Sequence, residues 1–126
     1  MNNFENKRDK GEFYEEKVAE YLRKKGYNIV EQNYHSHFGE IDIIAEDRAK
    51  PLLVFVEVKA REKSKGVHPF EAVDIRKQQT IIRAAQEYMM MHRVEDTYIR
   101  FDVVGVIIDD DVIEKIEVIQ DAFQAG

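Results

Sequence analysis

The sequence predicts an α/β fold in which a mixed five-stranded sheet is flanked by two helices. Two segments, residues 11–25 and 70–92, carry apolar residues at the spacing of an α-helix. Five other segments are rich in β-branched and aromatic residues and are bounded by turn-forming residues, which is typical of strands. The predicted order is helix, three strands, helix, two strands. Because a helix joins the third and fourth strands, we expect these two strands to run parallel.

The first predicted helix spans residues 11–25 and follows a polar segment, residues 1–9, that we expect to be disordered. Its apolar stripe consists of Tyr14, Val18, Tyr21 and Leu22. Gly26 is well suited to end the helix, because glycine readily adopts the left-handed conformation of a C-cap. A first strand is predicted directly afterwards, over residues 27–34.

Residues 39–61 predict a β-hairpin, because two apolar strands flank a polar turn that is closed by a proline. A turn centred between residues 49 and 50 places Asp42 opposite Glu57. The same turn places Glu40 opposite Lys59. Side chains alternate between the two faces of a strand, so these four charges share one face. A shift of one residue would move charges into the apolar face, so the register is well specified.

The opposite face of the hairpin is predicted to be wholly apolar. It consists of Ile41, Ile43 and Ala45 against Val54, Val56 and Val58. Nearer the turn, the charged face is completed by Ile44, Leu53 and Phe55. One face therefore belongs to the core throughout, and the other carries a polar cluster at the end far from the turn.

The rest of the chain supplies the second helix and two more strands. Residues 61–69 are predicted to form a charged loop, and residues 70–92 a long helix. One face of this helix carries Lys77, Ile81, Ala84, Ala85 and Tyr88. The last strands are predicted over residues 97–108 and 112–119. At 126 residues, we expect the whole chain to form a single domain.

Composition excludes several classes of protein. The chain has no cysteine, so it has neither a disulfide framework nor a thiolate metal site. It has no N-terminal apolar run and no apolar stretch long enough to span a membrane, so we expect a cytoplasmic protein without a membrane partner.

The net charge of −6 alone argues against a nucleic-acid-binding protein. Residues 109–126, however, carry six acids and one base, and so account for −5 of this charge. The remaining residues are nearly neutral, and residues 59–65 are locally basic. A basic segment beside the hairpin acids would suit a phosphate backbone, although a solvated loop would have a similar composition.

The hairpin charges point to a metal site. Directly opposed residues place their Cβ atoms roughly 4.5–5.5 Å apart, so Asp42 and Glu57 need a cation, a shared proton or solvent between them. Mg²⁺, with Mn²⁺ as an alternative, prefers oxygen ligands and often takes only one or two carboxylates. Lys59 would then lie beside the metal and could steady a water or neutralise a phosphate. The competing interpretation is a pair of cross-strand ion pairs at a solvated end of the sheet.

Four further polar residues are considered, namely Lys77, Gln78, Glu16 and Asp102. Lys77, followed by Gln78, could reach the acids, or it could be a helix lysine that extends to solvent. Glu16 lies off the centre of the apolar stripe, so its pattern alone predicts a surface residue. Asp102 could be a buried acid paired with Arg100 or Arg83, or it could contribute to the site.

The histidines do not predict a zinc site. His35 and His37 lack the spacing of helical metal motifs, and no cysteine supports them or His68. We therefore expect solvated loop histidines, although His37, two residues before Gly39, could approach a substrate phosphate.

These motifs together resemble a known group of enzymes. They comprise Glu16-x-x-Ala19, Leu22, Gly26, Gly39-Glu40-Ile41-Asp42-Ile43-Ile44-Ala45, Phe55-Val56-Glu57-Val58-Lys59-x-Arg61, Arg100-Phe101-Asp102-Val103-Val104 and Ala122-Phe123. The pattern resembles the PD-(D/E)xK nuclease superfamily, with its restriction-endonuclease-like fold. Within it, the chain is most similar to the YraN-like family of uncharacterised bacterial proteins, over nearly its whole length. It is similar, at a lower level, to archaeal Holliday-junction resolvases.

The resemblance implies roles for individual residues. It implies that Asp42 and Glu57 are metal ligands, that Lys59 is the catalytic lysine and that Glu16 is the helical acid at the edge of the site. The supporting residues would be Glu40, Lys77, Gln78 and Arg61. The chain departs from the superfamily at Ile41, where a proline is common, but this departure leaves the carboxylates in place.

The expected function is therefore a Mg²⁺-dependent nuclease that hydrolyses phosphodiester bonds in DNA, with branched or damaged DNA as candidate substrates. Two alternatives remain open. One is a nucleic-acid-binding or scaffolding module that keeps the fold without catalysis. The other is an RNA endonuclease, although no feature is evident that reads a 2′-hydroxyl. A homodimer would let so small a protein engage two strands, but no sequence feature specifies one.

Overall fold

The computed structural model describes residues 7–66 and 68–125, and it confirms the predicted order of elements. The helices and strands are α1 (Lys7–Lys24), β1 (Asn28–His35), β2 (Glu40–Asp47), β3 (Leu52–Glu62), α2 (Ile75–Met91), β4 (Tyr98–Asp109) and β5 (Val112–Phe123). Two short 3₁₀ segments, η1 (Lys63–Lys65) and η2 (Pro69–Ala72), lie between β3 and α2.

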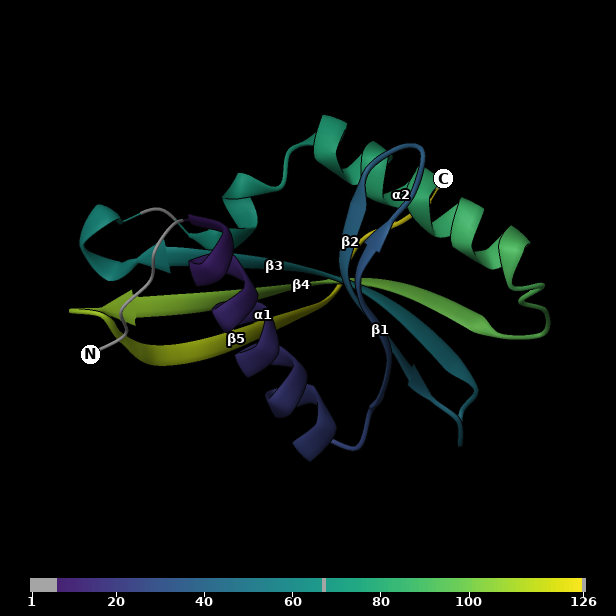
Figure 1. The fold of residues 1–126 in the computed structure, drawn as a ribbon, viewed down its shortest axis with the longest axis horizontal. Coiled ribbons are helices and arrows are strands. Elements are labelled where there is room, and N and C mark those ends of the chain that lie inside the picture. The colour runs from purple at the N-terminus through teal and green to yellow at the C-terminus, as the bar shows by residue number, and fades with distance from the viewer. Residues whose placement is uncertain (1–6, 67, 126) are drawn as a thin grey trace.

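The five strands form one mixed sheet in the order β1-β2-β3-β4-β5. The predicted crossover is confirmed, because β4 runs parallel to β3 while every other neighbouring pair is antiparallel. Helices α1 and α2 pack on opposite faces of this sheet, and the turn between β1 and β2 passes over α2 (Figure 1). The described part of the chain has no helix that is both long and apolar enough to cross a membrane.

Each helix buries its apolar stripe in a separate core. Helix α1 contributes Tyr14, Val18, Ala19 and Leu22 to the first core. Helix α2 contributes Ile81, Ala84, Ala85 and Tyr88 to the second. Strand β3 lies between the two cores, and its first residues are buried on both faces. A central strand of this kind has a continuous apolar sequence, which makes the charge at Glu57 conspicuous.

The hairpin register is confirmed, but one residue takes the opposite face. Ile43 lies opposite Val56, as a turn centred between residues 49 and 50 requires. Ile41, however, packs in the α2-side core, whereas Ile43 packs in the α1-side core. The prediction that they share one apolar face is therefore wrong. The β2–β3 ladder ends at this point, and β1 and β2 bend towards α2 (Figure 1).

The ends of several elements differ from the prediction. Helix α1 begins at Lys7, so residues 7–9, which we expected to be disordered, are helical. Residues 1–6 lie outside the described residues. Strand β3 continues through Glu62 into the expected loop, and β5 runs on to Phe123. These differences lengthen predicted elements and leave their order unchanged.

The second helix starts later than predicted. Its N-cap is Asp74, whose side chain accepts a hydrogen bond from the backbone N–H of Lys77 at 2.9 Å. The preceding residues form η2, in which the buried Pro69 packs against Gly105 of β4. A helix starting at residue 70 is therefore wrong, because this segment is anchored on the sheet before the chain turns into α2.

Candidate active site

Three carboxyl groups meet where the β2–β3 ladder ends, and we call Glu15, Asp42 and Glu57 the acid cluster. Asp42 lies one residue beyond Ile43, the last residue of β2 that pairs with β3. Its Oδ2 accepts a hydrogen bond from the backbone N–H of Val58 at 2.8 Å. This bond ties the side chain across the opening between the two strands and holds it beside Glu57.

Glu57 is the most buried member of the cluster, with 4% of its surface exposed. Two lysines approach the same oxygen: Nζ of Lys59 lies 3.5 Å and Nζ of Lys77 lies 3.9 Å from Oε1. The second oxygen, Oε2, is buried without a hydrogen-bond partner in the described part of the chain. A buried carboxylate oxygen without a partner is costly, so this atom is suited to a ligand.

The helical side chain in the acid cluster is Glu15, whereas Glu16, the helical acid implied by the resemblance, lies outside the cluster. Glu16 is exposed, and its two oxygens accept hydrogen bonds from Arg23 at 3.2 Å and Gln32 at 3.1 Å. Consecutive helix residues differ by 100° in direction, so the two glutamates cannot face the same site.

The helical periodicity of the sequence already indicated that Glu15 faces the sheet. Glu15 lies three, four and seven residues before Val18, Ala19 and Leu22, which are all buried, so it belongs to the stripe that faces the sheet. Sequence reasoning missed it because it took the helical acid from the family pattern rather than from the stripe.

The pKa values of all three carboxyl groups in the acid cluster are raised. Burial, and then the charge of Asp42 and a hydrogen bond to it, raise the pKa of Glu15 to about 8. Burial also raises the pKa of Asp42, against the opposing effects of the Val58 N–H and of Lys77. Burial and the charge of Asp42 raise the pKa of Glu57 to about 7, although both lysines oppose this shift. The three carboxyl groups, if all ionised, would therefore carry more negative charge than the two nearby lysines balance.

The donor set fits a hard divalent cation. Within residues 7–66 and 68–125, no three His, Cys, Asp or Glu side chains form a ready-made metal-binding group. Mg²⁺, however, is often held by one or two carboxylates and keeps several waters. Asp42 and Glu57 provide two carboxylates, and one oxygen each of Glu15 and Glu57 is buried without a hydrogen-bond partner among the described residues. A cation would satisfy these oxygens and displace the retained protons.

A hollow of about 480 Å³ on the α1 side borders the acid cluster at Glu15. It is lined by Gly11, Glu12, Glu15, Asn33, His35 and Glu40. Asn33 interrupts β1 with a left-handed backbone (φ 52°), and its hydrogen bond to Glu15 lowers the pKa of that carboxyl. The cluster is therefore buried on the sheet side and approached through a polar opening.

The predicted supporting residues have different positions. Lys77 reaches Glu57, which favours the first of its two interpretations. Gln78 instead donates a hydrogen bond to the carbonyl of Val73 at 3.1 Å, and Arg61 donates one to the carbonyl of Ala60 at 2.7 Å. Their side chains thus hold nearby backbone.

The predicted pairing of Glu40 with Lys59 is not found among the described residues. Glu40 lies 3.1 Å from Nδ1 of His35, and Lys59 pairs with Glu57. The prediction assumed a continuous ladder, whereas the strands separate beyond Ile43 and Val56.

Comparison with known proteins places the chain in a family. The model of the uncharacterised protein family UPF0102 matches residues 14–106, which include the whole acid cluster and both lysines. The chain belongs to UPF0102. A UPF0102 protein of Acetivibrio thermocellus is 41% identical over 128 residues, covering 98% of this chain and 97% of that protein. The UPF0102 protein of Persephonella marina is 41% identical over 98 residues, covering 78% and 83%. That of Fusobacterium nucleatum is 42% identical over 105 residues, covering 83% and 87%.

Asp102 of this UPF0102 chain has a structural role apart from the acid cluster. It is buried and accepts two hydrogen bonds of 2.8 Å from Arg100, so the pairing with Arg100 rather than Arg83 is the one present. The same carboxylate accepts the backbone N–H of Asp121 at 2.9 Å, and Arg100 donates to the hydroxyl of Tyr27 at 2.8 Å.

The histidines lie on the surface, as expected. His35 pairs with Glu40, and His68 lies 3.2 Å from Glu117 and caps η2. His37 contacts Glu87 of α2 through both its backbone N–H and its ring.

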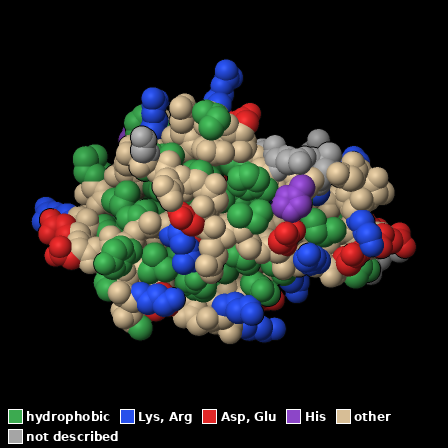
Figure 2. Space-filling view, turned by 180° about the vertical axis from the view of Figure 1, so that it is seen from behind, with side chains coloured by type: hydrophobic (Ala, Val, Ile, Leu, Met, Phe, Trp, Pro, Cys, Tyr) green, Lys and Arg blue, Asp and Glu red, His purple; other side chains and the backbone are tan. Residues whose placement is uncertain are grey.

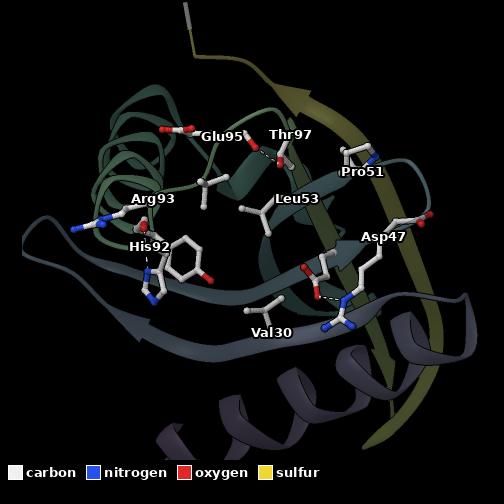
Figure 3. A pocket seen from close by; sticks show the side chains of 13 residues that line it. Val30, Asp47, Pro51, Leu53, His92, Arg93, Glu95 and Thr97 are labelled. Carbon is white, nitrogen blue, oxygen red and sulfur yellow. Dashed lines mark hydrogen bonds and ion pairs between the residues drawn. The ribbon is translucent and has the colours of Figure 1, made fainter.

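A second hollow, of about 430 Å³, lies at the other end of β2 and β3 (Figure 3). Its lining includes Asp47 and Pro51 from the β2–β3 turn and His92 and Arg93 from the end of α2. Asp42 lies five residues from Asp47 along β2, or about 17 Å at the rise of a strand. This hollow is therefore separate from the acid cluster.

Proposed function

We propose that this UPF0102 chain is a metal-dependent phosphodiesterase that hydrolyses DNA. The observation that carries the proposal is the surroundings of Glu57, a carboxylate buried in a central strand beside Asp42 and two lysines. One of its oxygens has no hydrogen-bond partner in the part of the chain that the structure describes. The family is compatible with the nuclease resemblance of the sequence. Strongly perturbed carboxyl groups at the end of a hollow also mark functional sites more often than structural ones.

Asp42 and Glu57 would hold the metal, with Glu15 adjusting the charge of the pair. A bound Mg²⁺ or Mn²⁺ would supply Lewis-acid stabilisation of the phosphoryl oxygens and a water that is readily deprotonated. Lys59 is positioned to donate a hydrogen bond to a phosphate oxygen and to neutralise charge that develops there. Its side chain is 23% exposed, so it can turn from Glu57 to a substrate without unfolding.

Lys77, which lies on α2, is the second cation beside Glu57. Because α2 is the crossover between the parallel strands, its first turn lies beside Glu57. Lys77 is 37% exposed and can bind a phosphate or balance the carboxylates. The net charge of −6 does not describe the surroundings of Glu57. Most of it comes from residues 109–126, which carry six acids and one base.

The experiment is a cleavage assay on labelled single-stranded, duplex, flap and junction DNA with Mg²⁺ or Mn²⁺, with an RNA strand as a further substrate. We expect Asp42→Asn and Lys59→Ala each to lower the rate by about 100-fold or more. Glu15→Gln should lower it and weaken Mn²⁺ binding in calorimetry. Glu16→Gln is the matched control and should leave both quantities unchanged.

Cleavage that persists in Asp42→Asn and Lys59→Ala would overturn the proposal. Equal effects of Glu15→Gln and Glu16→Gln would overturn the assignment of the helical acid. Faster cleavage of RNA would replace DNA as the substrate.

A second candidate is a module that binds nucleic acid without cleaving it. It is favoured by the lack of a ready-made three-residue metal group among residues 7–66 and 68–125. Salt-dependent DNA binding, without Mn²⁺ binding in calorimetry and without cleavage, would identify this function.

A further inference from the structure

The turn between β1 and β2 displays an aromatic side chain on a firmly tied backbone. The Ser36 hydroxyl donates a hydrogen bond to the Gly39 carbonyl at 2.7 Å and accepts the N–H groups of Phe38 at 3.0 Å and Gly39 at 3.1 Å. The backbone N–H of Ser36 donates to the same carbonyl at 2.9 Å. Phe38 lies within this closed turn and is 51% exposed.

The turn is also fixed to α2. The backbone N–H of His37 donates to Glu87 at 3.1 Å, and the His37 ring contacts the other oxygen of the same carboxylate. Gly39 lies so close to Thr80 that an added Cβ would be 2.6 Å from its Cγ2. Single exposed apolar residues are common and need no explanation. Phe38 differs because the backbone on both of its sides is held, so its ring is presented at a defined place.

Two exposed arginines lie on the side of α2 that contacts this turn. Arg76 and Arg83 precede and follow Thr80 by four and three residues, so they lie on the same side of α2 as the contact with Gly39. Both are exposed, and neither forms a salt bridge or side-chain hydrogen bond within residues 7–66 and 68–125. Lys77, next to Arg76, reaches Glu57. The cations therefore extend from the turn towards the acid cluster.

We propose that Phe38, Arg76 and Arg83, which we call the turn surface, bind unpaired nucleotides of a DNA strand. Phe38 would stack on a base, and the arginines would contact phosphates. A positive surface combined with an exposed aromatic ring is how proteins hold single strands, since every base has a face for stacking. Within a duplex these faces are covered, so the turn surface selects against continuous duplex.

The inference rests on the proposed function for the position of the cleaved bond. Phe38 precedes Asp42 by four residues, so their Cα atoms are at most about 13 Å apart, the length of four residues in an extended strand. Stacked nucleotides are about 3.4 Å apart along a strand, so this distance spans at most about four of them. The preferred substrate is then DNA with an unpaired segment a few nucleotides from the cleaved bond, such as a flap, an overhang or an open junction.

The test measures binding in the presence of EDTA, so that it does not depend on catalysis. Fluorescence anisotropy compares a labelled single strand of about 16 nucleotides with a duplex of the same sequence. We expect wild type to prefer the single strand, and Phe38→Ala to weaken its binding roughly 5- to 150-fold. Tyr98→Ala is the matched control, because Tyr98 is a 74% exposed aromatic residue at the opposite end of the sheet, and it should bind as wild type does.

Two further variants separate stacking from apolar contact and from charge. A 2-aminopurine base in the strand should lose fluorescence when wild type binds, because of stacking, but not when Phe38→Leu binds. Replacing Arg76 and Arg83 by glutamine should reduce the salt dependence of log K by about 0.7 for each residue. Phe38 is exposed, so Phe38→Ala should keep the wild-type melting temperature.

The inference is overturned if Phe38→Ala binds as tightly as wild type, or if Tyr98→Ala weakens binding equally. It is also overturned if duplex binds as tightly as single strand, or if RNA binds in preference to DNA. The proposed function fails separately, in the cleavage assay, because Lys59→Ala should lose cleavage and still bind the single strand.

Discussion

Glu57 shows how a single charged residue can be kept in a central strand. Its neighbours on β3 are apolar, and its surface is almost fully buried. Lys59 and Lys77 offset part of the cost at one oxygen, while the other oxygen has no partner in the described part of the chain. Without a bound cation the cluster is therefore electrostatically unbalanced, and it compensates by retaining protons.

This proton retention predicts that the metal-free chain becomes less stable as pH rises from about 5 to about 8. The pKa of Glu57 is about 7 and that of Glu15 about 8, both above their ordinary value of 4.5. The folded chain then holds protons that the unfolded chain releases, so the free energy of unfolding falls with pH in this window. The loss for Glu57 is of the order of 3 kcal/mol.

Urea denaturation in EDTA across this pH range measures the effect. Glu57→Gln removes one of the two titrating groups and should reduce the dependence, whereas Glu16→Gln should preserve it. Stability that rises steadily from about pH 5 to about pH 8 would contradict the prediction.

At this scale, the sequence predicted the core of the candidate site but not its edges. Alternation along the hairpin was sufficient to bring Asp42 near Glu57, and the helical stripe brought Lys77 to the same place. The predicted partner of Glu40 was wrong because β2 and β3 separate before they reach this residue. The point of separation depends on how the strands bend, which the residue pattern does not specify.

Among the elements, η2 illustrates how a short segment can set the start of a helix. Pro69 packs on β4 at Gly105, where an added Cβ would lie 2.7 Å from the Pro69 ring. Asp74 then caps α2 and so places Lys77 in its first turn. Periodicity alone predicted that this helix begins at residue 70. Apolar residues that face the core have similar spacing in an α-helix and in a short 3₁₀ segment, so the pattern does not distinguish the two.

We therefore expect Gly105→Ala to destabilise the chain by about 1–3 kcal/mol, because the methyl group would overlap Pro69. The backbone of Gly105 is not in the left-handed region, so the effect is steric. Urea denaturation gives the magnitude. Gly11→Ala is the matched control, since an added Cβ there meets nothing within 4 Å and alanine favours a helix. An equal effect of the two substitutions would contradict the steric explanation.

Across the whole molecule, the Arg100 and Asp102 pair joins parts that are distant in sequence. It connects β4 to the bulged end of β5 through Asp121, and to the chain after α1 through Tyr27. The pair is well buried, with 17% and 4% of the two side chains exposed.

We expect Asp102→Ala to destabilise the chain by about 3–5 kcal/mol, because it leaves Arg100 with an uncompensated charge. Asp42→Ala should instead be neutral or stabilising near pH 8 without metal, because it relieves repulsion in the acid cluster. Thermal denaturation of the two variants checks this contrast. If both lost stability equally, the division between a structural and a functional acid would be wrong.

The architecture was predictable from the sequence because periodicity, turn residues and the crossover rule agree along most of the chain. The parallel pairing of β3 and β4 followed from the helix between them. Figure 2 shows charges of both signs interspersed over one face of the molecule. These charges follow no periodicity along the sequence, so the surface partners of individual residues were not predictable.

The strand order also has a consequence for folding kinetics. Three of the four strand pairs are hairpins between chain neighbours, which close over short turns. Pairing of β3 with β4 must wait for closure of the whole segment from Lys63 to Thr97, whose entropy cost is larger. The same event brings Lys77 to Glu57. We therefore expect the acid cluster to gain Lys77 only in the last step of folding, so that partly folded chains lack the complete site.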